Sequence, residues 1–329
     1  MTLLLDDRSV SSVLDPASLV EAIEHAIRTD AEVPADVPGR MNLSGGGRFF
    51  RIMPAVVPHS GVMGLKTFFG GNGVGVRYLI MLASIETGEV LAMMDACYLT
   101  AARTAATSAI AARALGVKAT RLGVLGSGLE AEAHLRTFAA VSEIDEIKVF
   151  SPNPESRERL ADRLREELDL PVAPAVTAAE ACAGVGHVIT ATNTGYGGPI
   201  ACESGWLPSG LHISAIGSTH RDLRELDTAV FSRAGTLVFD ADPEQIADES
   251  GDIRRFVEEG GGLGSVLRLS DLLQGKAALP EDAQGDLTIF KSVGTALQDM
   301  VAAELVYRRA VEAGLGGTWD ELAIPKSRR

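Results

Sequence analysis

Cysteine is scarce in this chain, and its few cysteines lack the spacing of a metal site. Cys97, Cys182 and Cys202 are the 3 cysteines among 329 residues. They cannot all pair with one another, which favours a reducing compartment. We therefore expect them to lie in the hydrophobic core, and we expect no bound metal.

Positive charge is also in short supply. Lys and Arg number 30 against 44 Asp and Glu, which gives a formal net charge of −14. Nucleic acids and anionic membrane surfaces both require a basic face, so this balance argues against either as a partner. A small anionic substrate would need arginine and lysine side chains gathered locally.

Long apolar runs are missing as well. The opening stretch MTLLLDDRSV has no basic segment and turns acidic at Asp6. No run approaches the roughly 20 apolar residues of a membrane-spanning helix. We expect a cytoplasmic protein, and the 46% hydrophobic content allows two domains with sizeable cores.

The N-terminal third predicts one helix followed by an antiparallel sheet. Asp15 and Pro16 form a helix start, and apolar residues recur at helical spacing from Leu19 to Ile27. The β-like runs that follow are RFFRIM, GVMGLKTFF, RYLIMLASI and EVLAMMDA. The last two runs are joined across residues 86–88 as a hairpin.

An arginine lies within the small-residue stretch YLTAARTAATSA. We predict a helix from Leu99 to Leu115, with Thr100 as its cap and Gly116 just past its end. Arg103 would then lie in the first turn, where the helix dipole disfavours a cation unless an anion joins it. Arg103 is therefore interpreted as half of an anion site, against the simpler reading of a solvated surface arginine.

Strands and helices alternate from Ala119 onward. RLGVLGSG, EIKVF, GHVITAT, LHISAIGS, GTLVFDA and DLTIF are short apolar strands, and LEAEAHLRTFAAV and PESRERLADRLREEL are helical. Such alternation predicts parallel βαβ units in a doubly wound sheet. A last helix, at about residues 296–313, is expected to pack back on the first domain.

The stretch VLGSGLEAEA carries a dinucleotide-binding pattern. Gly126, Gly128 and Ala131 match G-x-G-x-x-A directly after a strand, and Ser127 and Leu129 complete the turn that opens the helix. The first glycine permits the turn, the second lets a pyrophosphate approach, and the small third residue lets helix pack on strand. A chance glycine turn is the alternative, but the surrounding strands and helix favour a bound dinucleotide.

The end of the second strand of such a unit distinguishes the two nicotinamide cofactors. An acidic residue there binds the ribose hydroxyls of NAD, and its absence admits the 2′-phosphate of NADP. Ser151 holds this position, with Asn153 and Arg157 close behind. The cofactor is expected to be NAD(P)H, with the pattern favouring NADP; an ordinary turn before a helix cap is the alternative reading of Asn153.

The motifs together resemble one family. RIMPA, GLKTF, YLTAARTAATSA, VLGSGLEAEA, SAIGSTHRDLRELD and FKSVGTALQDM follow one another as in the ornithine cyclodeaminase/mu-crystallin family. The resemblance implies an α/β protein, with a doubly wound Rossmann domain at residues 117–294. This domain would be inserted into a second, α+β domain with an antiparallel sheet, formed by residues 1–116 plus 295–329. The second domain would bind the substrate and form the homodimer interface.

The resemblance also implies roles for particular residues. Arg40, Lys66 and Arg103 match side chains that gather round a substrate carboxylate, with Lys66 and Arg103 expected to be catalytic. From the sequence alone, Lys66 would be read as a surface lysine at a strand end. The positions that match residues lining the cofactor are Thr192, Ala215, Gly217, Ser292 and Val293.

Two departures from the cyclodeaminase pattern indicate the activity. Arg51 stands where those enzymes have an acid, and Thr219 stands where they have an aspartate that could act as base on the distal amine. Arg51 would repel that amine and is expected to bind a second carboxylate or developing charge. The proton donor is expected to be Lys66 or an ordered water rather than His220, which is interpreted as a solvated loop residue.

The predicted function is therefore NAD(P)-dependent reduction of a small 2-imino acid, or of a 2-oxo acid plus amine, to an amino acid. Cyclodeamination of ornithine with recycled NAD is one alternative. A mu-crystallin-like nucleotide-binding protein is the other.

Overall fold

The computed structural model describes residues 1–71, 73–280, 286–320 and 322–326, and its chain forms two compact units. The first unit comprises Met1–Arg103 and Thr295–Arg329, and the second comprises Thr104–Gly294. Helix α3, Cys97–Ala114, carries the boundary between them. The functional division of the chain at residue 116 stays a prediction.

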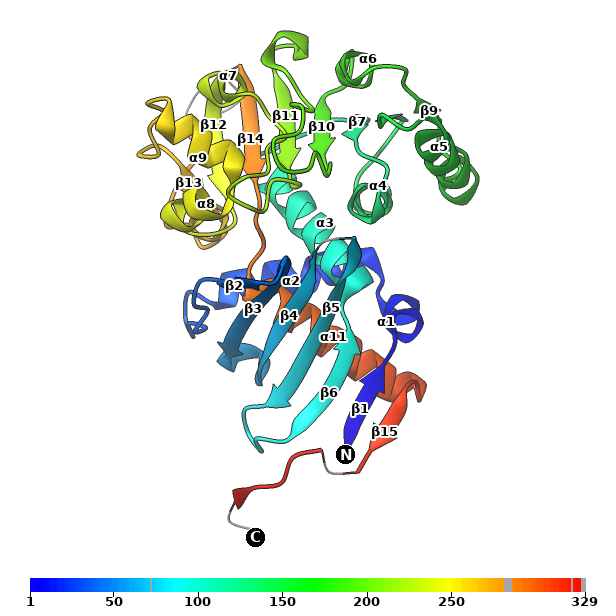
Figure 1. The fold of residues 1–329 in the computed structure, drawn as a ribbon, viewed down its shortest axis with the longest axis vertical. Coiled ribbons are helices and arrows are strands. Elements are labelled where there is room, and N and C mark those ends of the chain that lie inside the picture. The colour runs from blue at the N-terminus through cyan, green and yellow to red at the C-terminus, as the bar shows by residue number, and fades with distance from the viewer. Residues whose placement is uncertain (72, 281–285, 321, 327–329) are drawn as a thin grey trace. The chain divides into compact units, whose positions relative to one another are not determined.

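The first unit is built on a seven-stranded sheet. Its strand order is β15-β1-β6-β5-β4-β3-β2 (Figure 1). The strands are β1 Thr2–Leu5, β2 Met41–Gly45, β3 Arg48–Val57, β4 Val62–Gly71, β5 Val74–Ser84, β6 Val90–Asp95 and β15 Gly317–Trp319. Strands β2 to β6 are antiparallel, and Gly88 at φ 71° makes the predicted β5–β6 turn.

The antiparallel sheet expected from the sequence is extended by two strands at one side, one of them in parallel. Strand β1 pairs in parallel with β6 and antiparallel with β15, so both ends of the chain enter the same sheet. Helix α1, Asp7–Val13, follows β1 and was not predicted.

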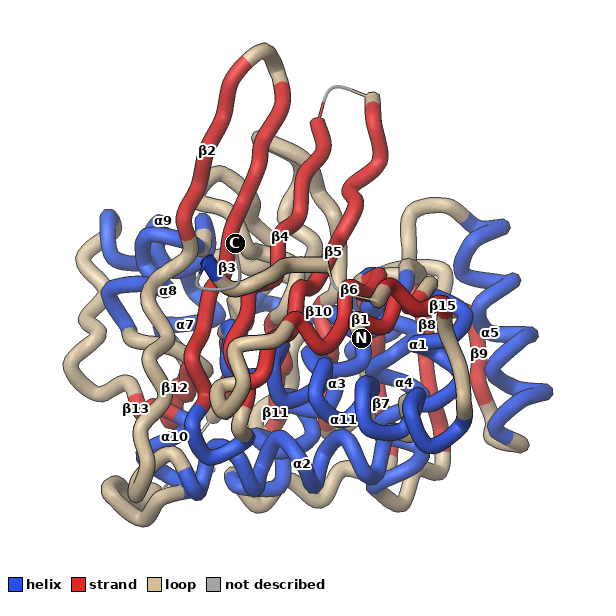
Figure 2. Tube along the Cα trace, turned by 90° about the horizontal axis from the view of Figure 1, so that it is seen from below, coloured by secondary structure: helices blue, strands red, loops and turns tan. Residues whose placement is uncertain are grey.

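Helices cover one side of this sheet. Helix α2, Pro16–Thr29, is capped by the Asp15 side chain as predicted, and it buries the apolar stripe from Leu19 to Ile27. Helix α11, Ala296–Ala313, packs against α2, β3 and β4, as expected for the last helix. Figure 2 shows the β2–β3 hairpin extending away from these helices. A short 3₁₀ helix, Pro58–Ser60, links β3 to β4.

Helix α3 begins earlier than the sequence suggested. It starts at Cys97, whose backbone N–H donates to Asp95 Oδ1 at 2.8 Å. Thr100 is therefore not the cap, and Arg103 lies in the second turn rather than the first. The predicted end is confirmed: Gly116, at φ 68°, donates to Arg113 O, and Val117 donates to Ala112 O.

The second unit contains an eight-stranded parallel sheet in the order β13-β12-β14-β11-β10-β7-β8-β9. Its strands are β7 Arg121–Leu125, β8 Glu146–Phe150, β9 Val172–Pro174, β10 His187–Thr190, β11 Leu211–Ala215, β12 Ala234–Phe239, β13 Leu267–Arg268 and β14 Leu287–Lys291. The strand order reverses at β7, between β8 and β10, which confirms the doubly wound prediction. Dinucleotides bind at such a reversal, outside the carboxyl ends of the strands.

The helices of the second unit connect these strands. They are α4 Leu129–Val141, α5 Pro154–Leu168, α6 Ala178–Cys182, α7 Thr228–Ser232, α8 Pro243–Glu249, α9 Gly251–Glu258 and α10 Leu269–Leu273, with a 3₁₀ turn at Ser204–Trp206. In the described part of the chain, no helix combines the length and the apolar character needed to cross a membrane.

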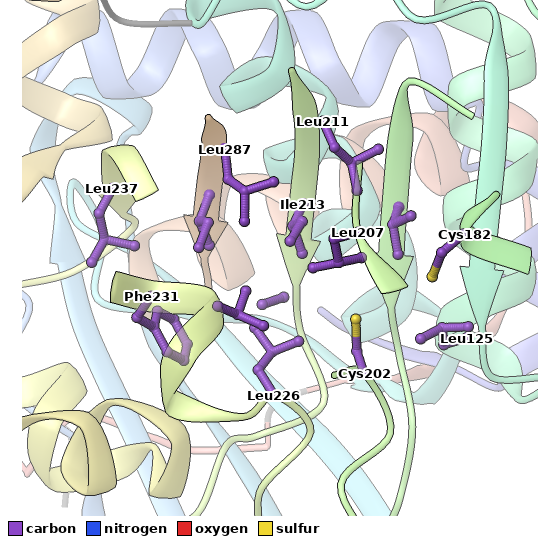
Figure 3. Close-up of a cluster of buried hydrophobic side chains, with 14 of the residues drawn as sticks. Leu125, Cys182, Cys202, Leu207, Leu211, Ile213, Leu226, Phe231, Leu237 and Leu287 are labelled. Atoms are coloured by element: carbon purple, nitrogen blue, oxygen red, sulfur yellow. The ribbon is translucent and has the colours of Figure 1, made fainter. Parts of the chain in front are cut away.

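A buried apolar cluster holds the parallel sheet to its covering segments. Side chains of β11 and β14, such as Ile213 and Leu287, meet Leu226 and Phe231 (Figure 3). Cys182 and Cys202 belong to this cluster, as expected for core residues, whereas Cys97 is half-buried at the start of α3. Each Å² of apolar surface buried in this cluster stabilises the fold by roughly 25 cal/mol. The cluster therefore holds in place the strands whose carboxyl ends carry the candidate cofactor residues.

Candidate functional site

A buried ion cluster lies inside the first unit. Lys66 of β4 and Arg103 of α3 both reach Asp299 of α11: Lys66 Nζ donates to Asp299 Oδ1 at 2.8 Å, and Arg103 Nε donates to the same oxygen at 2.9 Å. Arg103 Nη1 also donates to Gln298 Oε1 at 3.0 Å. Two of the residues predicted to bind substrate are thus brought together by a carboxylate of the chain itself.

Burial strongly affects the ammonium of Lys66. The side chain is 1% exposed, and desolvation, together with the nearby Arg103 charge, lowers the pKa of Lys66 from 10.5 to about 7. Asp299 opposes this shift through its charge and its hydrogen bond, while Arg40 adds to it. A lysine with such a pKa exchanges protons near neutral pH and gains stabilisation when an anion binds beside it.

Aromatic rings pack against the cations of this sheet. The Phe68 ring centroid lies 5.3 Å from Arg51 Cζ, 5.5 Å from Arg40 Cζ and 5.7 Å from Lys66 Nζ. Arg51 also lies over Phe49, with Cζ 5.0 Å from the ring centroid. Cation–π contacts of this kind hold guanidinium groups in place without neutralising them. Arg40, Arg51 and Lys66 therefore lie around Phe68, and Lys66 is linked to the fourth predicted cation, Arg103, through Asp299.

Sequence reasoning missed Asp299 and Gln298. Both lie in the quoted motif FKSVGTALQDM, and Asp299 is an acidic residue in the first turn of α11. Gln298 completes a capping box with Thr295, a pattern that was readable as T-x-x-Q. The signal for Asp299 was weaker, because a first-turn acid usually serves the helix dipole. Its Oδ2 is buried and has no hydrogen-bond partner within the described residues.

The glycine turn of the second unit has the geometry predicted for a dinucleotide. Gly126 has φ 130°, and a Cβ there would lie 2.3 Å from Ala191 O. Gly128 precedes α4 as a cap without a side chain, and a Cβ there would meet nothing within 4 Å. Ala131 is fully buried behind them. An open glycine at an uncapped helix N-terminus fits a pyrophosphate, which accepts hydrogen bonds from the backbone N–H groups.

Ser151 lies at the end of β8, beside this turn. It is 6% exposed; its Oγ accepts from Ser127 Oγ at 2.9 Å and donates to Asn153 O at 3.2 Å. Asn153 caps α5, and Arg157 Nη1 donates to Ser151 O at 2.9 Å. The structure therefore gives each of these residues a local role in the turn, and Ser127 and Ser151 link the two segments that would flank an adenosine ribose.

A buried carboxylate joins two strand ends. Glu225 is 1% exposed, and its Oε1 accepts from Thr192 N at 2.6 Å and from Thr192 Oγ1 at 2.8 Å. Its Oε2 accepts from Gly217 N at 2.6 Å and from Thr190 Oγ1 at 3.1 Å. Gly217 is required here, because a Cβ would lie 2.3 Å from Thr192 O. Two predicted cofactor residues, Thr192 and Gly217, are thus held by one side chain that the prediction did not include.

A second carboxylate holds the neighbouring pair of strand ends. Asp240, after β12, accepts from Ser292 Oγ at 2.6 Å, Val293 N at 3.1 Å and Gly294 N at 2.9 Å. Ser292 N in turn donates to Ala215 O at 3.1 Å. Asp240 thus holds Ser292 and Val293 beside Ala215, as Glu225 holds Thr192 and Gly217.

His220 and Thr219 follow this border in a half-buried loop. His220 Nδ1 accepts from Asp222 N at 3.3 Å, and its ring meets Tyr196 edge-on with centroids 5.3 Å apart. The backbone N–H of Thr219 donates to Gly217 O, and the Asp222 carboxylate of the same loop lies 3.6 Å from His220 Nδ1. The assignment of His220 as a loop residue rather than the proton donor stays a prediction.

The fold and these residues define a Rossmann-type protein with a second, mixed-sheet unit. The chain belongs to the ornithine cyclodeaminase/mu-crystallin family: residues 2–314 match the sequence model of that family. The resemblance inferred from the motifs is thereby confirmed.

Similar proteins include enzymes that act on cyclic imines and amino acids. The Δ1-pyrroline-2-carboxylate reductase of Bacillus cereus is 31% identical over 264 residues, which are 79% of this chain and 77% of that protein. The structure of the Thermococcus litoralis Δ1-pyrroline-2-carboxylate reductase with NADH and L-proline has a TM-score of 0.89 and 28% identity, covering 97% of this chain and all of the other. An archaeal alanine dehydrogenase dimer with bound NAD has a TM-score of 0.86 and 29% identity, covering 96% and 98% of the two chains.

Proposed function

We propose that this protein is an NAD(P)-dependent oxidoreductase that reduces the C=N bond of a small 2-imino acid, or of a 2-oxo acid plus amine, to give an amino acid. The observation that carries the proposal is the buried cluster of Lys66, Arg103 and Asp299, in which a lysine with a pKa of about 7 lies beside a guanidinium. The reductases and the dehydrogenase among the similar proteins support the same class of reaction.

Arg103, Arg40 and Lys66 are assigned to the substrate carboxylate. Guanidinium groups bind carboxylates through paired, charge-assisted hydrogen bonds, and the bonds of Arg103 to Asp299 and Gln298 fix the plane in which it can do so. Arg51, held over Phe49 and Phe68, is assigned to a second carboxylate or to charge that develops during the reaction.

The cofactor residues are assigned to the second unit. The turn from Gly126 to Leu129 would hold the pyrophosphate, and Thr192, Ala215, Gly217, Ser292 and Val293 would line the nicotinamide end. When bound, the reduced nicotinamide supplies the hydride that adds to the imine carbon. The imine nitrogen must gain one proton for each hydride added, and Lys66 or a water that it orders is assigned to provide this proton.

We propose that the working form is a homodimer in the cytoplasm. The dimer reported for the archaeal alanine dehydrogenase supports the first part. Light scattering at micromolar concentration should give twice the monomer mass of 34.5 kDa. A monomeric mass would contradict the dimer while leaving the reaction untouched.

One assay tests the function against its alternatives. Nicotinamide absorbance is followed with Δ1-pyrroline-2-carboxylate, with 2-oxo acids plus ammonia or methylamine, and with ornithine. Net oxidation of the nicotinamide cofactor in the presence of an imine supports a reductase. Proline formed from ornithine without net oxidation of the cofactor would establish a cyclodeaminase. Tight nucleotide binding without turnover of any substrate would establish a binding protein. Lys66→Met should abolish the reduction, and Lys118→Met, which alters an exposed lysine, is its matched control.

A further inference from the structure

The side chain of Glu225 determines how one hydroxyl group at the candidate nicotinamide end can hydrogen-bond. Four groups donate to its carboxylate, and two of them, Thr192 N and Gly217 N, are backbone N–H groups that cannot accept a hydrogen bond. The other two are the hydroxyls of Thr190 and Thr192. Each carboxylate oxygen of Glu225 accepts from one backbone N–H and from one threonine hydroxyl, so both oxygens act as acceptors in this set.

Neighbouring groups fix the segment that carries Glu225. Asp252 Oδ1 accepts from the backbone N–H of Glu225 at 2.8 Å, which fixes the segment that carries the carboxylate. The amine of Lys291 is fully buried nearby and donates to Ala215 O at 3.2 Å; burial lowers the pKa of Lys291, and the charges of Asp252, Glu225 and Asp240 oppose that shift. A buried carboxylate that accepts from four donors is held rigidly in place.

A threonine hydroxyl has one proton to give. Thr192 Oγ1 gives this proton to Glu225 Oε1 at 2.8 Å, and the backbone N–H of the same residue goes to the same oxygen. The remaining capacity of Thr192 Oγ1 is its lone pairs, which accept. The half-buried Thr192 hydroxyl can therefore bind a donor and is mismatched to an acceptor.

We propose that Glu225 is a positioning residue that makes Thr192 an obligate hydrogen-bond acceptor, and that the group recognised there is the carboxamide NH₂ of the nicotinamide ring. The inference rests on the proposed use of a nicotinamide cofactor. The NH₂ group is the donor of the carboxamide, and it distinguishes the natural ring from a ring that carries an acetyl group at the same position. Glu225 would select the orientation of the carboxamide without touching the cofactor.

Calorimetry with two nucleotides tests this proposal. The wild type should bind NAD about tenfold more tightly than 3-acetylpyridine adenine dinucleotide, whose methyl ketone has no N–H to donate, since one hydrogen bond left unmade costs about that much. Thr192→Val should weaken NAD binding and leave the analogue unchanged, which removes the discrimination. Thr192→Ser keeps the hydroxyl and should keep the discrimination.

Glu225→Gln tests the positioning role itself. In Glu225→Gln the amide NH₂ faces either Thr192 N or Gly217 N, and neither can accept from it, so the side chain must move and no longer fixes the Thr192 hydroxyl as a donor. The ratio of the affinity for NAD to that for the analogue should therefore fall towards one. If Glu225 only stabilises the fold, Glu225→Gln should lower the melting temperature and weaken the binding of both nucleotides equally, so the ratio of their affinities should not change. Thr194→Val is the control, because the Thr194 hydroxyl donates to the backbone oxygen of Arg224 in the same loop and should leave the ratio unchanged.

The outcomes separate the inference from the proposed function. Equal affinity of the wild type for the two nucleotides, or an unaltered ratio in Thr192→Val, would overturn the inference while leaving a nicotinamide enzyme in place. If Glu225→Gln does not fold, the comparison of Thr192→Val with Thr192→Ser still tests whether the Thr192 hydroxyl discriminates between the two nucleotides. If the wild type bound neither these two nucleotides nor NADP, both the inference and the proposed function would be overturned.

Discussion

The ammonium of Lys66 lies 2.8 Å from Asp299 Oδ1, although the two residues are 233 positions apart in the chain. The same carboxylate oxygen accepts from Arg103. Asp299 thus positions both side chains, and it raises the pKa of Lys66 against the larger effect of burial.

Removal of the Asp299 charge should shift the pH dependence of activity. Asp299 raises the pKa of Lys66, which burial and Arg103 lower to about 7. In Asp299→Asn that pKa should fall further, so the protonated form assigned to catalysis is lost at lower pH. We expect the falling limb of kcat/KM to move to lower pH, with at least about a tenfold loss at pH 8. Asp248→Asn, at an exposed carboxylate, is the control, and an unshifted profile in Asp299→Asn would contradict the assignment.

Lys66 should also leave a signature in the pH dependence of stability. Its pKa is about 7 in the folded protein, against the ordinary lysine value of 10.5, so between these values the unfolded chain binds more protons than the folded one. Stability should therefore rise with pH across this window, by up to about 1.4 kcal/mol per pH unit from this group. Denaturant unfolding of Lys66→Met should lack that part of the slope, whereas Lys118→Met should retain it. Identical slopes in all three proteins would show that Lys66 is not buried as a titrating group.

Arg103 should not be replaceable by lysine. A lysine keeps the charge but lacks the planar fork that bonds Asp299, Gln298 and a substrate carboxylate, so Arg103→Lys should lose about 2 to 4 kcal/mol in kcat/KM. Arg103→Gln should lose a similar amount and should also lower the free energy of unfolding by about 1 to 3 kcal/mol, since a buried carboxylate loses a partner. Steady-state kinetics and thermal melting check both effects, and near-wild-type kcat/KM in Arg103→Gln would end the anion-site interpretation.

Substitution of the two glycines in the nucleotide turn should affect different properties, stability for Gly126 and nucleotide binding for Gly128. Gly126→Ala places a Cβ 2.3 Å from Ala191 O at φ 130°, so it should cost at least about 1 to 3 kcal/mol of stability. Gly128→Ala meets no protein atom within 4 Å, so the fold should persist while the methyl group obstructs the pyrophosphate and weakens binding about tenfold. Melting and nucleotide titration distinguish the two, and undiminished binding in Gly128→Ala would place the pyrophosphate elsewhere.

Cofactor choice should depend on Ser151. A carboxylate in Ser151→Asp would oppose a 2′-phosphate, so the variant should lose affinity for NADP much more than for NAD. Titration of both nucleotides into wild type and variant measures this. Wild-type binding of NAD at least about ten times tighter than NADP would contradict the preference that the missing acid indicates.

Local signals in the sequence predicted most elements of the fold. Asp15 and Pro16 start α2, Gly116 in the left-handed conformation ends α3, and the alternation after Ala119 corresponds to the parallel sheet. Strand β1 was missed because four residues, TLLL, show no readable period, and its partners are distant in sequence. The start of α3 was misplaced because the residue whose side chain caps it, Asp95, is also the last residue of β6.

In the candidate site, too, the residues with local sequence signals were predicted and those with distant partners were not. Gly126, Gly128 and Ala131 were readable because one turn and one helix fix their relations within six positions of chain. Asp299, Glu225 and Asp240 were not, because each acts through contacts with segments elsewhere in the chain. A buried carboxylate looks like any surface acid in a sequence that holds 44 acidic residues. Its role appears once the fold removes it from water and gives it donors.

Isotope transfer from the cofactor tests the central claim most directly. The enzyme is incubated with Δ1-pyrroline-2-carboxylate and NADH or NADPH deuterated at both C4 positions, and the product is examined by mass spectrometry and NMR. Reduction of the C=N bond predicts one deuterium at the α-carbon of the amino acid for each nicotinamide oxidised. An amino acid formed without deuterium, or no consumption of either nucleotide with any imine, would contradict the account.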